Sequence, residues 1–198
     1  MGCDEMEFKN IFLKELCEIR TGYQGKKEEG SMYTLINPTD FNNDGIINLE
    51  NSKTFGHNKI NLKYVLKDQE ILFKAKSSNY AVGIFENADG TGNLVPSGHF
   101  FILNIKSNLK EEISPKYIAW YLSEEKAQKH FKALASGMAM AIVKKSDLEN
   151  LIVPIPPLFI QKKIADIQEE FIKEKVLLEK LISLKEKKIK NILNDLIK

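Results

Sequence analysis

The apolar residues at the end of the chain follow the spacing of one long helix. From Leu158 to Ile197 there is no glycine and no proline, and apolar residues recur at intervals of three and four. This spacing is typical of the seam of a coiled coil. Glu174 occupies one seam position, and after Lys185 the stripe slips by one residue before it resumes. The expected seam consists of Ile160, Ile164, Ile167, Phe171, Leu178, Leu181, Ile189, Ile192 and Leu196.

A helix of this length extends roughly 57 Å at 1.5 Å per residue. A globular domain at one end cannot cover an apolar stripe that long, and no earlier segment predicts a helix long enough to run beside it. We therefore expect the helix to associate with a second helix, most simply that of another copy of the chain. The alternative, in which the helix folds back onto its own domain, stays open at this point.

The residues before this helix alternate between short apolar runs and polar turns. Five runs predict strands, and Ser114-Pro115 predicts the start of a helix because serine caps helices and proline fits their first turn. The expected strands cover residues 32–36, 71–74, 81–85, 99–105 and 151–153, and the expected helices cover 115–123 and 124–134. The chain is thus predicted to be α+β, with a mixed α/β domain over residues 1–157 and a long coiled-coil helix over 158–198.

Composition and charge narrow the class of protein. The chain has 198 residues, 43% of them apolar and 28% charged, and no apolar run approaches the roughly 20 residues that span a bilayer. The N-terminus lacks the basic and apolar regions of a signal peptide. Cys3 and Cys17 have no CxxC or histidine spacing and are interpreted as reduced thiols of a cytoplasmic protein, without a metal.

The net charge of the chain is +2, but its two parts differ. From Phe159 onward there are 10 lysines and 7 acidic residues, which leaves 19 basic and 20 acidic residues before it. A domain that gripped nucleic acid unaided would usually carry an excess of basic residues. If this domain binds nucleic acid, its basic groups are locally clustered or a partner supplies them.

The sequence carries no recognisable catalytic motif. It has no GxxxxGK[ST] loop, and its one Pro-Pro pair lacks the Asn or Asp that amino-methyltransferases place before it. Residues 89–93 contain GxG without the third glycine, which favours a hairpin turn. His57, His99 and His130 share no spacing. We therefore expect no catalysis by this chain alone.

Residues 40–45, Asp-Phe-Asn-Asn-Asp-Gly, look like the start of an EF-hand calcium loop. Position twelve of that loop should be a glutamate, but it is Asn51, and the preceding residues are strand-like instead of helical. We interpret the segment as an Asx-rich turn, with no bound metal.

Several segments together resemble one half of a type I restriction-modification specificity subunit. They are the run from Phe12 to Gly22 (FLxxLxEIRxG), Asp68–Phe73 (DQEILF), Ile113–Leu122 (ISPKYIxxYL) and, most characteristic, Leu148–Ile164 (LxxLxVPxPPLxxQxxI). The resemblance covers essentially the whole chain. Gln69-Glu70 replaces the family's usual Gly-Asp, and the sequence holds one recognition domain and one spacer helix where a full member has two of each.

This resemblance implies a DNA-reading domain similar in fold to that of adenine methyltransferases of the Taq type. In the family, two spacer helices pair antiparallel and hold two such domains apart. A half-length chain is then expected to form a homodimer through its helix and to read an interrupted, palindromic double-stranded DNA site. The expected partners are methyltransferase subunits, which hold S-adenosylmethionine, and in some systems a motor-nuclease subunit. No cofactor is expected in this chain.

Polar loops at the strand ends are the candidates for DNA contact. The glycine at 25 allows the backbone to approach a phosphate closely. The loop after residue 74 offers both phosphate-binding and base-reading side chains. Ser136-Gly137 resembles a stretch that the family uses near DNA. The candidates are Gln24, Lys26, Lys27, Lys74, Lys76, Ser77, Ser78, Asn79, Tyr80, Ser136 and Gly137. Arg20, the only arginine, equally fits a structural role, and Tyr117, Trp120 and Tyr121 have the helical spacing of core residues.

A second hypothesis belongs to a different class. The chain would be a protein-interaction module or regulator whose helix pairs with another specificity subunit, and its domain would not read DNA. A stand-alone nuclease is poorly supported, because neither Glu28-Glu29 nor Glu70 with Lys74 has the frame of a metal site.

Overall fold

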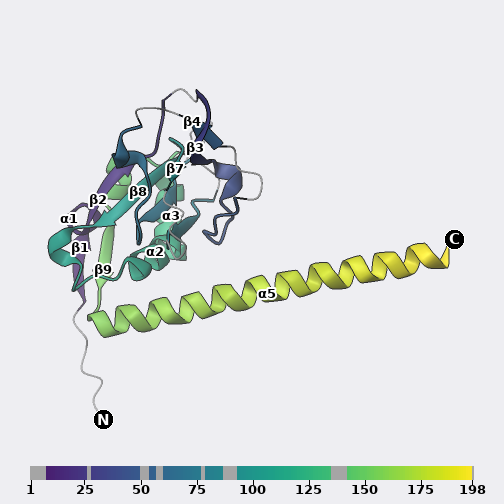
Figure 1. Cartoon of the computed structure of the whole chain (residues 1–198). Coiled ribbons are helices and arrows are strands. Elements are labelled where there is room, and N and C mark those ends of the chain that lie inside the picture. Colours follow the sequence, from purple (N-terminus) through teal and green to yellow (C-terminus); the bar gives the residue numbers. More distant parts are fainter. Residues whose placement is uncertain are drawn as a thin grey trace, which may run out of the picture.

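The computed structural model describes residues 8–25, 28–49, 54–56, 60–76, 79–86, 93–134 and 142–197. It has two visibly different parts (Figure 1): a globule of three small sheets and several helices, and the 39-residue helix α5 (Leu158–Leu196). Helix α5 begins at the base of the globule, passes beneath α2 and extends well beyond it. No helix of the described residues is both long and apolar enough to cross a membrane.

The central sheet has four antiparallel strands in the order β2-β8-β5-β6. Strand β8 has the sequence FFILNI and is buried along nearly its whole length, as expected for an inner strand covered on both faces. Its register is fixed by β2 on one side and β5 on the other. The strands are β2 (Cys17–Thr21), β8 (Phe100–Ile105), β5 (Ile71–Lys74) and β6 (Val82–Ile84).

Two smaller sheets flank the central one. The first joins β4 (Thr54–Gly56), β3 (Glu28–Ile36) and β7 (Leu94–Pro96), with β3 and β7 parallel. The second pairs β1 (Lys9–Phe12) with β9 (Ile152–Ile155), so the start of the chain lies beside the strand that leads into α5. The pairing of β1 with β9 therefore joins the two ends of the globular domain next to the start of α5.

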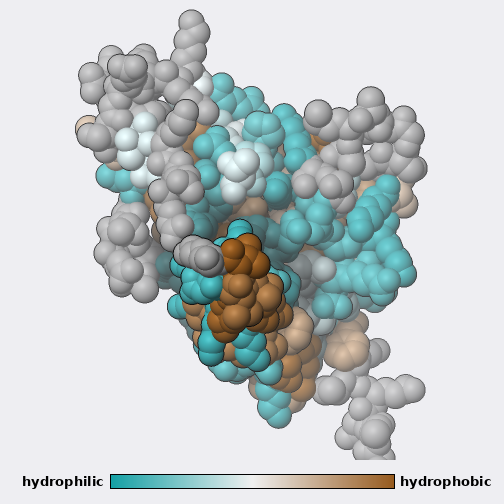
Figure 2. Space-filling model, turned by 90° about the vertical axis from the view of Figure 1, so that its right-hand side faces the viewer, coloured by the Kyte–Doolittle hydropathy of each residue, from teal (hydrophilic) through white to brown (hydrophobic). Residues whose placement is uncertain are grey.

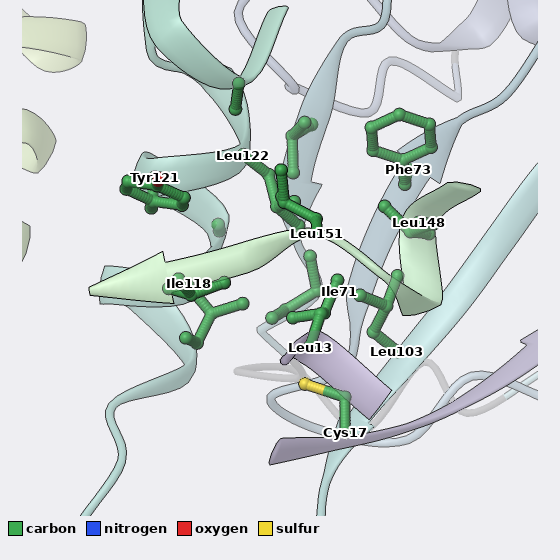
Figure 3. Packing of buried hydrophobic residues seen from close by; sticks show 14 of the residues in the cluster. Leu13, Cys17, Ile71, Phe73, Leu103, Ile118, Tyr121, Leu122, Leu148 and Leu151 are labelled. Carbon is green, nitrogen blue, oxygen red and sulfur yellow. The ribbon is translucent and has the colours of Figure 1, made fainter. Parts of the chain in front are cut away.

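Helices and strands enclose one main hydrophobic core. Figure 3 shows side chains from separate elements converging on this core. They include Leu13, Leu122, and Cys17, Ile71 and Leu103 of the central sheet. The helices around this core are α1 (Leu13–Leu16), α2 (Pro115–Ser123), α3 (Glu125–Leu134) and α4 (Lys145–Glu149), with short 3-10 turns η1 (Pro38–Asp40), η2 (Leu62–Tyr64) and η3 (Ser107–Leu109). Helix α2 begins as expected, with the Tyr117 N–H donating to the Ser114 hydroxyl at 3.4 Å.

Most of the predicted elements are confirmed. The expected strands correspond to β3, β5, β6, β8 and β9, the expected helices to α2, α3 and α5. Residues 87–92 lie outside the described part of the chain, but the flanking strands β6 and β7 belong to different sheets. The hairpin turn expected at residues 89–93 falls mainly on residues 87–92 and stays a prediction.

Candidate nucleic-acid interface and helix seam

One end of the central sheet collects the loops that the sequence singled out. Strands β2 and β5 end there and β8 begins there, since Thr21 pairs with Phe101 and Lys74 pairs with Phe100. The opposite end of the sheet carries Cys17 and Ile105, beside α1. The loops that follow β2 and β5 therefore emerge together, at the sheet end away from α1.

Backbone hydrogen bonds connect these loops to the turn at residues 97–99. The Tyr23 N–H donates to the Pro96 carbonyl at 2.7 Å, and the Ala75 N–H donates to the His99 carbonyl at 2.9 Å. Lys76 forms an isolated bridge with Ile142, and the Val143 N–H donates to the Ala75 carbonyl at 3.0 Å. The segment that directly follows residues 135–141 is thus held beside the loop after β5.

Two glycines allow the loops to approach this closely. A Cβ at Gly22 would lie 2.2 Å from the Ser97 carbonyl oxygen, and one at Gly98 would lie 2.6 Å from Cγ of Gln24. No side chain is accommodated at Gly22 without moving backbone. Glycine at these positions lets the loop after β2 rest directly on the 97–99 turn.

The described candidates are exposed, half-buried or, in the case of Tyr80, buried. Gln24, Lys76 and Asn79 are exposed on this end of the sheet. Lys74 is half-buried, and its ammonium donates to the Pro38 carbonyl at 3.0 Å. The remaining candidates, Lys26, Lys27, Ser77, Ser78, Ser136 and Gly137, lie outside the described residues.

Tyr80 is not available to touch a base, which corrects its selection. Its side chain is 1% exposed, its ring stacks on Phe73 with centroids 6.0 Å apart, and it meets the edge of Phe131 at 5.9 Å. Burial raises the pKa of its hydroxyl. The loop after β5 turns inward at this residue because the aromatic ring completes the core under α3.

The structure adds two exposed residues that sequence reasoning did not select. His99 lies in the turn before β8, with Nδ1 3.4 Å from the Ser97 hydroxyl. Lys144 directly follows the Val143 that pairs with Ala75. The sequence signal that could have identified His99 is the turn dipeptide Ser97-Gly98, which directly precedes the strand predicted over residues 99–105. Nothing local to Lys144 indicates its position.

Arg20 has a structural role, one of the two readings that the sequence left open. Its guanidinium makes a two-pronged ion pair with Glu70, at 2.7 and 2.6 Å, and Nε donates to the Lys63 carbonyl at 2.6 Å. Glu70 is 1% exposed and also accepts from the Lys67 N–H. A buried carboxylate needs such partners, so Arg20 is committed to holding the loop before β5.

In the family that this sequence resembles, the position of Gln69 is usually occupied by glycine. The backbone conformation of Gln69 explains that preference. Its φ is +63°, in the left-handed region that favours glycine. Its N–H donates to the Phe85 carbonyl at 2.8 Å, which fixes this conformation. The substitution therefore keeps the turn at the cost of backbone strain, while Glu70 still supplies the carboxylate.

The interpretation of residues 40–45 as an Asx-rich turn is confirmed. Oδ1 of Asn42 accepts from the N–H groups of Asp44 and Ile46, at 3.0 and 2.8 Å, and Gly45 has φ of +78°. The carboxylate of Asp40 accepts from the Asn37 N–H at 2.8 Å. Within the described residues no three His, Cys, Asp or Glu side chains group as metal ligands.

Gln161 fixes the start of α5 to the globule. Its side chain is buried, with Oε1 accepting from the Ser114 N–H at 2.9 Å. Its Nε2 donates to the carbonyls of Glu112 and Pro156, at 3.0 and 2.8 Å. One amide thus joins the helix to the cap of α2 and to the linker after β9, while Ile164 packs against the main core.

Two ion-pair contacts continue this attachment along α5. Lys116 of α2 contacts Glu86 and Glu169, each at 2.7 Å, and Lys175 contacts Asp44 of the Asx-rich turn at 2.5 Å. Hydrogen bonds from Lys116 and Lys173 lower the pKa of Glu169 to about 2. The helix therefore contacts its own domain as far as Lys175, but these contacts leave Ile167 and Phe171 of the seam exposed.

From Ile167 onward the seam lies to one side of these contacts, although Ile164 near its start packs against the main core. Residues that meet the domain, such as Gln161, Ala165 and Ile172, lie on one stripe, and the seam lies roughly 100° around the helix from it at 100° per residue. Ile167 is 71% exposed and Phe171 is 58% exposed, although neighbouring residues touch the globule. Figure 2, a view along α5 from its C-terminal end, shows apolar residues in brown open to solvent there.

Fold and sequence together define a DNA specificity domain of a type I restriction-modification system. Residues 5–191 match the family model described as the type I restriction modification DNA specificity domain, and the chain belongs to this family. A protein of Methanocaldococcus jannaschii, assigned as the specificity subunit of the type I restriction enzyme MjaX, is 30% identical over 179 residues. That match covers 86% of this chain and 34% of the relative.

Solved specificity subunits share the fold. The S subunit of M. genitalium superposes with a TM-score of 0.61 at 19% identity, covering 93% of this chain and 44% of that one. A chain from a study of assembly and conformational transition of the type I R-M system has a TM-score of 0.64 at 15% identity, covering 97% of this chain and 45% of the other. The chain therefore spans about a third of its curated relative and less than half of these structures.

Proposed function

We propose that this chain reads one half of an interrupted DNA site for a type I restriction-modification system and has no catalytic activity of its own. The observation that carries the proposal is the convergence of the loops after β2 and β5 on the 97–99 turn, with residues 142–143 beside the loop after β5, within a chain of the specificity-domain family. We divide the chain at residues 157 and 158 into a DNA-reading domain and a spacer helix.

The exposed side chains at this end of the sheet suit two kinds of DNA contact. Lys76 and Lys144 would contact phosphates, which position the protein, and Gln24 and Asn79 would contact base edges, which select the sequence. Each good two-pronged amide or guanidinium contact discriminates by about 1–3 kcal/mol. His99 adds a further polar group between these loops. The nearly balanced charge of residues 1–158 is consistent with partners that hold much of the DNA backbone.

A homodimer through α5 would duplicate the reader. Two identical domains would lie at opposite ends of an antiparallel helix pair, roughly 57 Å apart, compared with about 34–36 Å for one turn of DNA. Since such a dimer has two-fold symmetry, its target would be an interrupted palindrome. Methyltransferase subunits, which hold S-adenosylmethionine, would modify adenine in that site, and a motor-nuclease subunit would add cleavage where the system has one.

Selection from a random duplex pool tests this function, with the chain alone and with its methyltransferase partner. The expected result is enrichment of two inverted half-sites at a fixed spacing. A Gln24→Ala, Asn79→Ala variant should lose sequence preference, while Lys126→Ala at an exposed position of α3 serves as the control. No enrichment even with the partner would overturn the proposal.

The second candidate is an interaction module that pairs with another specificity subunit and does not read DNA. Its support is the same exposed seam, which would accept any helix with a complementary stripe. Co-purification with a full specificity subunit, together with failure to enrich any DNA sequence, would favour this candidate over the first.

A further inference from the structure

The outer positions of the α5 seam are symmetric about Leu178, whereas the inner seam residues Glu174 and Leu181 lie 4 residues before it and 3 residues after it. Moving outward from Leu178, seam positions occur 7, 11, 14 and 18 residues away on both sides. On the N-terminal side they are Phe171, Ile167, Ile164 and Ile160, and on the C-terminal side they are Lys185, Ile189, Ile192 and Leu196. The slip after Lys185, which looks like a defect in a heptad repeat, is what produces this symmetry.

We infer that two copies of α5 pair antiparallel with their two-fold axis at Leu178, an inference that rests on the proposed homodimer and fixes its register. In this register Ile160 faces Leu196 of the second copy, Ile164 faces Ile192 and Ile167 faces Ile189. Leu178 faces its own equivalent. At distances of 11, 14 and 18 residues an apolar position meets another apolar position, as in the packed layers of a coiled coil, and at 7 residues Phe171 faces Lys185.

The two charged seam residues support this orientation. Glu174 lies 4 residues before Leu178 and Lys185 lies 7 residues after it. In the antiparallel register their offset along the axis is three residues, about 4.5 Å, so each glutamate reaches the lysine of the other copy. A parallel, in-register pair would instead place glutamate beside glutamate and lysine beside lysine, which is unfavourable.

From Ile167 onward the domain leaves this seam free for a second copy, while Ile164 at its start is half-buried against the main core. The residues of α5 that meet the globule, including Gln161 and Ala165, are on a separate stripe. Seam residues on both sides of the axis are exposed, from Ile167 at 71% to Leu196 at 76%. With Leu178 on the axis, each junction at Leu158 lies 20 residues from it, which places the two junctions about 60 Å apart.

Cysteine cross-linking tests the register without DNA. In the full chain carrying Cys3→Ser, Leu178→Cys should form a disulfide-linked dimer on mild oxidation, because only a residue on the axis faces itself. Leu196→Cys should not, but mixing it with Ile160→Cys should give the mixed disulfide. Cys17 is buried, and burial raises its pKa to about 12, so it does not compete.

Charge exchange provides an independent test. Glu174→Lys and Lys185→Glu should each weaken self-association roughly tenfold, since each homodimer acquires two repulsive pairs. Mixing the two variants should restore dimerisation, because both cross-pairs become opposite in sign. Lys190→Glu, on the other side of the helix, should leave the dissociation constant unchanged.

The outcomes separate the register from the function. Efficient self-cross-linking of Leu196→Cys, or failure of the mixed charge variants to associate, would overturn the antiparallel register while leaving the dimer intact. A monomer in sedimentation at all working concentrations would overturn the dimer itself. Loss of DNA selection with normal cross-linking would instead count against DNA reading and leave the register standing.

Discussion

The two halves of α5 depend on different kinds of interaction. The half that lies along the globule, up to Lys175, is held by the buried amide of Gln161 and by ion pairs to α2 and the Asx-rich turn. The half beyond it exposes Leu181, Ile189 and Leu196 to solvent. A helix of that length with one apolar face is only marginally stable alone. Polar contacts fix the direction of the first half, while the second half needs a partner to cover its apolar face.

The largest expected effect comes from placing a charge on the two-fold axis. Leu178→Asp would bring two carboxylates together in a seam that is otherwise apolar there, which costs both desolvation and repulsion. We expect the dissociation constant of the dimer to rise on the order of 100-fold or more, measured by sedimentation. Helicity of the far half should fall in circular dichroism, because it loses its partner.

Lys190→Asp is the matched control, since that exposed residue faces away from the seam. The thermal transition of the globule should be the same in both variants. A dimer that withstands Leu178→Asp would show that the far half does not form the interface.

The next largest effect is expected in the half of α5 that lies along the globule. Gln161→Ala leaves the Ser114 N–H and the Glu112 and Pro156 carbonyls without their partner in a buried site. Unpaired buried polar groups and the space left behind should together lower the free energy of unfolding by about 2–4 kcal/mol, measured by urea denaturation. Lys162→Ala, at the exposed neighbouring position, should change it by less than about 0.5 kcal/mol.

A smaller, pH-dependent effect is expected at the contact between α2 and α5. Lys116 and Lys173 hold the pKa of Glu169 at about 2, below the usual value of about 4.3. Since the folded pKa is depressed, the stabilisation is complete above the unfolded pKa and is lost as pH falls from about 4.3 towards 2. Because Glu169 is 37% exposed, we expect Glu169→Gln to cost less than about 1 kcal/mol at pH 7 and low salt.

Denaturation of the Glu169→Gln variant at pH 7 and near pH 2 checks this contact, with Glu170→Gln as the control that contacts Lys173 alone among the described residues. The difference from the unmodified chain should vanish at the lower pH and shrink in high salt. An effect independent of pH would mean that packing, and not charge, supplies the contribution of Glu169.

Periodicity predicts the parts of this molecule that are long or fully buried. The alternation of apolar and polar residues in α5 and the continuous apolar run of β8 are local signals, and both elements follow them. Strand β1 was not predicted, because most of its side chains are exposed and it is held by pairing with β9, far along the chain. Its structure depends on a partner strand that no local pattern reveals.

The candidate site was only partly predictable for the same reason. Loops at strand ends can be found from turn residues, and Gln24, Lys76 and Asn79 were found that way. Tyr80 was selected wrongly because its polar neighbours hide the tertiary contact with Phe73 and Phe131. The joining of Ile142 to Lys76 is a contact across 66 residues of sequence, and it brings Lys144 to the candidate face without any local signal.

The smallest expected effect provides a reference inside the globule, away from both halves of α5. Gln69 holds a φ of +63°, and a left-handed backbone costs a residue other than glycine about 1–2 kcal/mol. Glycine relieves that strain but gains freedom in the unfolded chain, which offsets part of the benefit. We expect Gln69→Gly to stabilise the globule by about 0.5 kcal/mol, measured by denaturation, with dimerisation unchanged.

Gln69→Ala keeps the strain and removes the side chain, so it should give no such gain. If alanine stabilises as much as glycine, the strain lies in the side chain of Gln69 and not in its backbone.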